Sequence, residues 1–469
     1  MIKFGTDGWR AIISDDFTFE NVKIAAQAMA NFINKDSYAK NKEIIIGYDT
    51  RFLSEKYAQL IGCVLAANGI RVLLASKATP TPAVSFTIVN RKLGGGIMVT
   101  ASHNPAEFNG IKYKAYYGGS ADPETIKKIE SELYKGRVKF LFFEEACKSL
   151  LKMEDVIPDY LEAIRNYVDI GLLKKEKFNL LVDVMYGAGD NYIAGLLEGG
   201  RCRVDTIHSQ RNPGFGGMRP EPSAENLREM AGLMKKRDYS VGLATDGDVD
   251  RLGVITPQGE VISGHKVMAL LLKHLVEDKK LTGSVVQTIC GTVLINKMCG
   301  KYGLKVHETP VGFKYICEIM RKENVLIGGE ETGGIGFRGF IPERDGILSG
   351  LLILELMACK QKGIVEILNE IENEYGTFVY KRKDITYLDQ EKKKAIISKL
   401  EKEPPNDIIG KQIREVKADD GIKFVCDDLS WLLVRPSGTE PLVRIYAEAP
   451  DEQQSQQMIE FGEKIAFKI

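Results

Sequence analysis

Short apolar runs rich in β-branched residues alternate along the chain with longer stretches whose apolar residues recur at helical spacing. This alternation indicates βαβ units built on mainly parallel sheets. The strand-like runs are 44–48, 72–75, 96–100, 178–184, 203–207, 240–244, 284–288, 304–307 and 325–328, and helical stretches follow at 54–68 and after Pro82. The pattern predicts three α/β domains with mainly parallel, mixed sheets.

The pattern changes after about residue 376, where charged helical stretches separate the strand-like runs 423–426, 431–434 and 443–447. This change predicts a smaller C-terminal α+β domain with an antiparallel sheet. The four expected domains span residues 1–150, 151–254, 255–372 and 373–469.

Charge and composition exclude several partners. Lys plus Arg and Asp plus Glu both total 64 among 469 residues, so the zero net charge favours neither nucleic acid nor an anionic membrane as a partner. The most apolar run, 350–358, is too short to span a bilayer and contains Glu355. The eight cysteines have no metal-site spacing, and residues 1–7 lack the apolar core of a signal peptide, so we expect a cytoplasmic protein.

The first segment with candidate chemistry is 100–105, Thr-Ala-Ser-His-Asn-Pro. It follows a predicted strand, so we expect Ser102 at the carboxyl end of that strand, where open α/β sheets bind ligands. His103 and Lys112 are candidate proton carriers nearby. The alternative is an Asn-Pro turn whose side chains form only local hydrogen bonds.

Three carboxylates at i, i+2 and i+4, those of Asp246, Asp248 and Asp250, follow another predicted strand. They would repel one another unless a cation held them, and hard oxygen ligands suit Mg²⁺. An EF-hand is excluded, because Arg251 takes the place of the required glycine and Pro257 that of the final glutamate. The alternative is a solvated acidic turn.

Two further segments are rich in glycine and hydroxyl groups. The segment 328–334, Gly-Gly-Glu-Glu-Thr-Gly-Gly, can bond sugar hydroxyls, although taken alone it is better explained as a flexible loop. Its overlap with a Gly-x-Gly-x-x-Gly pattern does not indicate a dinucleotide site, because the preceding carboxylates would repel a pyrophosphate. The segment 435–441, Arg-Pro-Ser-Gly-Thr-Glu-Pro, and the nearby Arg444 favour a phosphate cradle over a plain Pro-Gly turn.

Together with the N-terminal segment 4–10, Phe-Gly-Thr-Asp-Gly-Trp-Arg, these four segments resemble the α-D-phosphohexomutase family. That family includes phosphoglucomutases, phosphomannomutases and phosphoglucosamine mutases, and the order and spacing of its motifs match along essentially the whole chain. The resemblance implies four domains around a central cleft, each giving one loop to the active site.

The resemblance also implies residue roles. Ser102 would carry the phosphoryl group, and Asp246, Asp248 and Asp250 would bind Mg²⁺ together with the phosphorylated Ser102. The basic residues of the active site would be Arg10, His103, Lys112 and Arg251. The substrate-binding residues would be Thr309, Gly312, Lys314, Glu330, Thr332, Arg435, Ser437, Gly438, Thr439 and Arg444.

The implied reaction interconverts hexose 1-phosphate and hexose 6-phosphate through a phosphoserine enzyme, with a hexose 1,6-bisphosphate as intermediate and activator. A sugar phosphate would be the small-molecule partner, and the protein would be a monomer or a homodimer. Thr332 departs from the serine that many members have in the sugar loop. This loop matches neither the glucosamine nor the dual glucose/mannose forms, so we expect glucose phosphate, followed by mannose and then glucosamine phosphates.

Two other classes of function remain as alternatives. A phosphatase of the haloacid-dehalogenase type would use Asp246 as its nucleophile, and its acyl phosphate would be labile to hydroxylamine, unlike a phosphoserine. A non-catalytic sugar-phosphate-binding protein would be expected to lack the serine or a metal carboxylate, and this chain has both.

Overall fold

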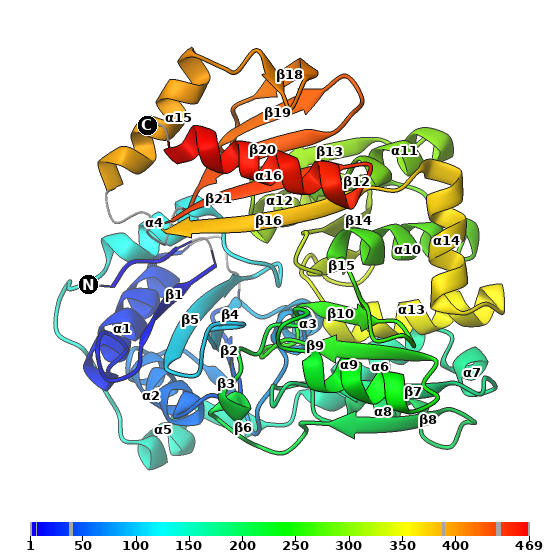
Figure 1. Cartoon of the computed structure of the whole chain (residues 1–469). Helices are drawn as coiled ribbons and strands as arrows, with labels where there is room; N and C mark the ends of the chain where they lie inside the picture. Colours follow the sequence, from blue (N-terminus) through cyan, green and yellow to red (C-terminus); the bar gives the residue numbers. More distant parts are fainter. Residues whose placement is uncertain (1, 6, 37–40, 387–389, 438–441, 468–469) are drawn as a thin grey trace.

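The computed structural model describes residues 2–5, 7–36, 41–386, 390–437 and 442–467, and these form four sheets with flanking helices (Figure 1). The first sheet has the order β1-β5-β4-β2-β3-β6, in which β4, β2, β3 and β6 run parallel and β5 pairs antiparallel with both β4 and β1. Its strands are β1 Trp9–Ile12, β2 Ile44–Tyr48, β3 Val72–Ala75, β4 Gly95–Val99, β5 Phe108–Ala115 and β6 Leu151–Glu154.

Helices cover both faces of the first sheet. Ile44 and Ile46 of β2 belong to a core that also contains side chains of α1 and α2, whereas Ile45 packs with Val84 and Ile88 of α3 on the other face. Because both faces are buried, the strand reads as a continuous apolar run rather than an alternating one. The helices are α1 Phe19–Lys35, α2 Ser54–Ala67, α3 Thr81–Arg91, α4 Pro123–Ser131 and α5 Phe143–Ser149.

The second and third sheets are mixed, with parallel strand pairs followed by antiparallel pairs at one edge. The second sheet has the order β11-β10-β9-β7-β8. Its strands are β7 Asn179–Asp183, β8 Arg203–Ile207, β9 Val241–Thr245, β10 Leu252–Ile255 and β11 Val261–Ile262. The helices of this part of the chain are α6 Ile157–Tyr167, α7 Ile170–Leu173, α8 Tyr192–Leu197, the short 3₁₀ helix η1 Phe215–Gly217 and α9 Arg228–Lys236. The third sheet has the order β13-β12-β14-β15. Its strands are β12 Ser284–Thr288, β13 Val306–Thr309, β14 Val325–Gly329 and β15 Ile335–Phe337. The helices of this part of the chain are α10 Gly264–Glu277, α11 Val293–Tyr302, α12 Phe313–Lys322, α13 Gly346–Lys360 and α14 Ile364–Tyr375.

The fourth sheet is antiparallel throughout its described strands and has the order β16-β21-β20-β19-β18-β17. This confirms the predicted change of architecture in the C-terminal part of the chain. The elements are β16 Val379–Thr386, α15 Gln390–Lys402, β17 Asp407–Ile408, β18 Lys411–Lys417, β19 Ile422–Cys426, β20 Trp431–Pro436, β21 Leu442–Ala449 and α16 Glu452–Phe467.

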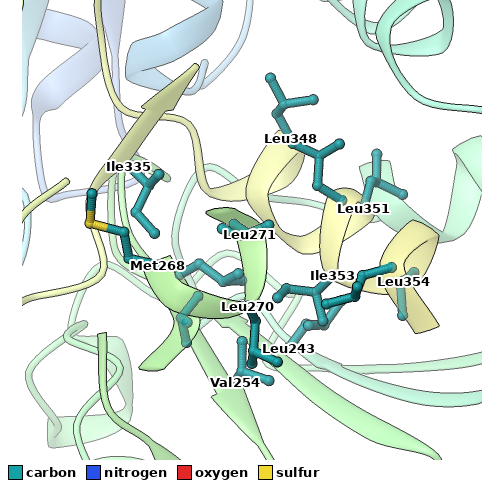
Figure 2. Close-up of a cluster of buried hydrophobic side chains, with 14 of the residues drawn as sticks. Leu243, Val254, Met268, Leu270, Leu271, Ile335, Leu348, Leu351, Ile353 and Leu354 are labelled. Atoms are coloured by element: carbon teal, nitrogen blue, oxygen red, sulfur yellow. The ribbon is translucent and has the colours of Figure 1, made fainter. Parts of the chain in front are cut away.

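One apolar core joins the second and third sheets. Figure 2 shows Leu243 of β9 and Val254 of β10 beside Leu270 of α10 and Ile353 of α13. The apolar run 350–358, which we judged too short for a bilayer, lies within α13, and this helix is buried along most of its length. Among the described residues, no helix is both long and apolar enough to cross a membrane.

The sheets do not end at the domain boundaries expected from the sequence. The first sheet continues to Glu154 and the second to Ile262, beyond the expected boundaries at 150 and 254. The second expected boundary falls inside a sheet because β10 turns back as a hairpin into β11, and this antiparallel pair belongs to the sheet of β9.

Candidate active site

Ser102 lies in the turn that follows β4, at the carboxyl end of a parallel strand, as expected. Its backbone N–H donates to Thr100 Oγ1 at 2.8 Å, and its φ of 51° is unusual for a residue with a side chain. The hydroxyl donates to Asp246 Oδ2 at 2.9 Å, and the residue is 2% exposed. The loop therefore points the Ser102 hydroxyl at the carboxylate cluster after β9.

Arg51, which the sequence analysis missed, donates hydrogen bonds to the backbone of this loop. Its Nη2 donates to the carbonyl oxygens of Ser102 and Asn104, both at 2.6 Å, and its Nη1 donates to that of Pro105 at 2.7 Å. The Asp49 carboxylate lies 3.1 Å from Arg51 Nε. Both follow β2, so their position after a parallel strand was a signal that could have identified them.

Asp246, Asp248 and Asp250 converge in the connection between β9 and β10. All three are fully buried, and one oxygen of each lies within 4.8 Å of the others. The Oδ1 atoms of Asp248 and Asp250 have no hydrogen-bond partner among the described residues. Burial and the two neighbouring carboxylates raise the pKa of Asp246 well above its ordinary value. The solvated acidic turn is therefore excluded, and the site is one that a cation would stabilise.

Lys112 of β5 brings a positive charge into this cluster. Its ammonium lies 2.8 Å from Asp248 Oδ2, 3.3 Å from Asp250 Oδ2 and 2.9 Å from Asp7 Oδ2. Burial would raise the pKa of Asp248, but Lys112 outweighs it and holds that pKa below its ordinary value. Burial would lower the pKa of Lys112, and the carboxylates, led by that of Asp248, raise it instead. Lys112 is therefore a fixed cation of the site.

Arg344, which the sequence analysis also missed, connects the loop that carries Asp250 to the loop that carries Glu330. Its Nη2 lies 2.6 Å from Asp250 Oδ2 and 3.1 Å from Asp7 Oδ2, and its Nη1 lies 3.0 Å from Glu330 Oε2. Burial would lower the pKa of Arg344, but these carboxylates, together with Glu343, raise it well above its ordinary value. The signal in the sequence was faint, because Arg344 sits in a short charged run before α13 that matches no motif.

The other predicted basic residues are Arg10, His103 and Arg251. Arg10 Nη1 donates to Asn104 Oδ1 at 2.7 Å, and Arg251 Nη1 lies 3.1 Å from Glu221 Oε1. His103 Nδ1 has no partner among the described residues. Burial, followed by Arg251 and Arg10, lowers the pKa of His103 well below its ordinary value, so its imidazole is neutral at pH 7.

The predicted sugar-contacting residues lie on two loops of the third sheet. Thr309 ends β13, Gly312 precedes α12 with a φ of 128°, and Lys314 lies in the first turn of that helix. Lys314 lines a cavity of about 170 Å³ together with Lys112 and Asp7. Glu330 and Thr332 follow β14, and Glu330 is held by Arg344. Segments of the first and third sheets and their flanking elements thus contribute charged groups to one cavity.

The predicted phosphate-binding residues lie on neighbouring strands of the fourth sheet. Arg435 of β20 is paired in register with Arg444 of β21, and the Ser437 N–H donates to the Leu442 carbonyl oxygen at 2.9 Å. Arg435 Nε donates to Asp420 Oδ2 at 2.8 Å, and Arg444 Nε lies 3.5 Å from Asp384 Oδ2. Gly438 and Thr439, which we also predicted here, lie outside the described residues.

Comparisons with known proteins agree with this arrangement. The α/β/α domains I, II and III and the C-terminal domain of phosphoglucomutase/phosphomannomutase match residues 1–138, 158–259, 263–375 and 387–461. A phosphoglucomutase/phosphomannomutase from Thermococcus kodakarensis is 31% identical over 98% of both chains. A phosphoglucosamine/phosphogalactosamine mutase from Sulfurisphaera tokodaii is 30% identical over 98% of both chains.

Solved structures share the whole fold. A structure from Thermus thermophilus is 32% identical, covers 99% of both chains and has a TM-score of 0.87. The Aspergillus fumigatus N-acetylphosphoglucosamine mutase, in complex with GlcNAc-6P and magnesium, is only 15% identical, with a TM-score of 0.62 over 100% of this chain and 95% of that one, and shows the fold alone.

The fold and the matched domains define a phosphohexomutase, an isomerase that acts as an intramolecular phosphotransferase. The chain belongs to the phosphoglucomutase/phosphomannomutase family.

Replacing Arg344 with Met should strongly destabilise the protein. The buried carboxylates of Asp250 and Glu330 would lose their shared cation, which costs about 3–5 kcal/mol for a broken buried ion pair. Urea unfolding at pH 7 measures the effect. The matched control is Arg338→Met, which removes an exposed arginine from the same segment. Equal losses in the two variants would contradict a central role for Arg344.

Proposed function

We propose that this chain interconverts hexose 1-phosphate and hexose 6-phosphate through phosphorylated Ser102. The observation that carries the proposal is the Ser102 hydroxyl, held 2.9 Å from Asp246 inside the carboxylate cluster and beside buried cations. A buried serine in that setting can hold a phosphoryl group only where positive charge offsets the added negative charge.

The cycle has two phosphoryl transfers. In the first, the bond between phosphorus and Ser102 Oγ breaks, a bond forms from phosphorus to a free hydroxyl of the hexose monophosphate, and that hydroxyl loses its proton. The resulting hexose bisphosphate turns around, and the second transfer returns the phosphoryl group at its other end to Ser102. His103 and Lys314, whose pKa values are lowered mainly by burial, are the candidates for carrying the proton, whereas Lys112 stays a fixed cation. The loop 435–441 would hold the phosphate that is not reacting.

Mg²⁺ fits the donor set at Asp246, Asp248 and Asp250. Three buried carboxylates lie within 4.8 Å of one another, and two of their oxygens lack partners among the described residues. We propose that these three residues, with the phosphorylated Ser102, hold the ion. When bound, Mg²⁺ would neutralise charge on the transferring phosphoryl group.

We propose glucose phosphate as the hexose, with hexose 1,6-bisphosphate as the activator that primes Ser102. The support is the Glu-Glu-Thr-Gly-Gly sequence of the sugar loop, which departs from the glucosamine and dual-specificity forms. Glucosamine phosphate, which the sequence analysis ranked third, becomes an equal alternative, because several archaeal relatives that match at least 90% of this chain are named phosphoglucosamine mutases. Mannose phosphate has comparable support from the name of the Thermococcus relative.

Replacing Ser102 with Ala should abolish turnover and leave the fold intact. Loss of the nucleophile should lower kcat by at least about 10⁴-fold. A coupled mutase assay measures the rate, and circular dichroism checks the fold. The matched control is Ser85→Ala, which removes a buried hydroxyl that has no partner among the described residues. Near-normal turnover by the Ser102 variant would rule out the phosphoserine mechanism.

Mg²⁺ should raise the melting temperature of chelator-treated protein, because an ion that binds only the native state stabilises it by about 2.7 kcal/mol at 100 times Kd. The Asp248→Asn variant should lose most of this shift, because it removes one charged ligand from the cluster. Differential scanning calorimetry with and without Mg²⁺ gives a readout independent of activity. The exposed Asp190→Asn variant is the control. A shift that survives in the Asp248 variant would place the ion elsewhere.

A further inference from the structure

Asp420 joins two candidate substrate-binding segments through a single oxygen atom. It lies in the turn between β18 and β19, with its side chain 22% exposed. Its Oδ2 accepts a hydrogen bond from Arg435 Nε at 2.8 Å and another from the backbone N–H of Val311 at 2.9 Å. Arg435 belongs to the proposed phosphate loop, and Val311 lies between Thr309 and Gly312 of the proposed sugar-contacting segment.

The contact at Nε controls the direction of the arginine. Among the described residues, the hydrogen bonds of the Arg435 guanidinium are confined to Nε, which leaves its two terminal nitrogens for a ligand. An arginine that is held at Nε by a carboxylate loses less freedom when it binds a phosphate. The turn packs closely against the backbone of Arg435, because Gly421 has a φ of 92° and an added Cβ would lie 2.9 Å from Arg435 Cα.

Asp420 is not needed to dock the fourth sheet on the third. Lys417 lies 2.8 Å from Glu308 Oε1, Lys423 Nζ donates to the Ile289 carbonyl oxygen at 2.6 Å, and the Val293 N–H donates to Glu448 Oε2 at 2.9 Å. These contacts join the same two sheets without touching Arg435. A change at Asp420 can therefore disturb the arginine while the interface stays assembled.

We infer that Asp420 is a positioning residue that aligns Arg435 for the substrate phosphate and couples this alignment to the docking of the 309–312 segment. The inference rests on the proposed function and deepens it. The phosphate loop would hold the non-reacting phosphate in both transfers. Replacing Asp420 should therefore weaken the binding of the substrate and of the transition state equally, which raises KM and leaves kcat nearly unchanged.

The test is a double-mutant cycle between Asp420→Asn and Arg435→Lys, read as KM and kcat in a coupled mutase assay. Asp420→Asn keeps the size of the side chain but removes its charge, and should raise KM about 10- to 100-fold with kcat nearly unchanged. In the Arg435→Lys background, which lacks Nε, the same change should have little further effect. The matched control, Lys417→Gln, breaks an ion pair of the same interface and should leave KM unchanged.

Additive effects of the two substitutions on KM, or an equal rise in KM for Lys417→Gln, would overturn the inference. Calorimetric binding of glucose 6-phosphate by the same variants separates this inference from the proposed function. Binding without turnover in the wild-type protein would refute the proposed function alone, and non-additive binding losses would still support Asp420. A wild-type protein that neither binds nor converts the sugar phosphate would refute both.

Discussion

Repulsion among three buried carboxylates is the constraint on which the rest of the structure depends. Asp246, Asp248 and Asp250 lie within 4.8 Å of one another without exposure to water, where the attraction and repulsion of charges are strongest. No single sheet supplies the compensating charge: Lys112 comes from the first sheet, and Arg344 from the segment before α13. The loops must therefore assemble together, or the charged groups remain unpaired.

The same cations make the assembled site suitable for phosphoryl transfer. Arg51 fixes the backbone that presents the Ser102 hydroxyl, and Lys112 and Arg344 hold positive charge on the carboxylates of Asp248 and Asp250 in the same cluster. A second buried ion pair, between Lys114 and Glu343, joins β5 to the segment before α13. These are the two segments that carry Lys112 and Arg344. A phosphoryl group arriving at Ser102 would therefore meet preorganised charge rather than water.

The sequence predicted best what depends on local pattern. The strands at 44–48, 72–75, 203–207 and 284–288 have the bounds of β2, β3, β8 and β12, because both local propensity and burial mark a parallel strand as an apolar run. The antiparallel edges escaped prediction, since β1, β10 and β15 are short and overlap or adjoin the motif segments. Arg344 escaped because its role arises from distant partners, which neither spacing nor periodicity records. Arg51 was marked only by its position after β2, and its bonds to the Ser102 loop cannot be read from that position.

The most direct test of the central claim is a coupled mutase assay with Mg²⁺ and the matching hexose bisphosphate. It should be run in parallel on glucose 1-phosphate, mannose 1-phosphate and glucosamine 1-phosphate. The account predicts conversion to the 6-phosphate, fastest for glucose 1-phosphate. A preference for another hexose would support the mutase activity and contradict glucose phosphate as the substrate. Folded protein that converts none of the three sugar phosphates would contradict the account.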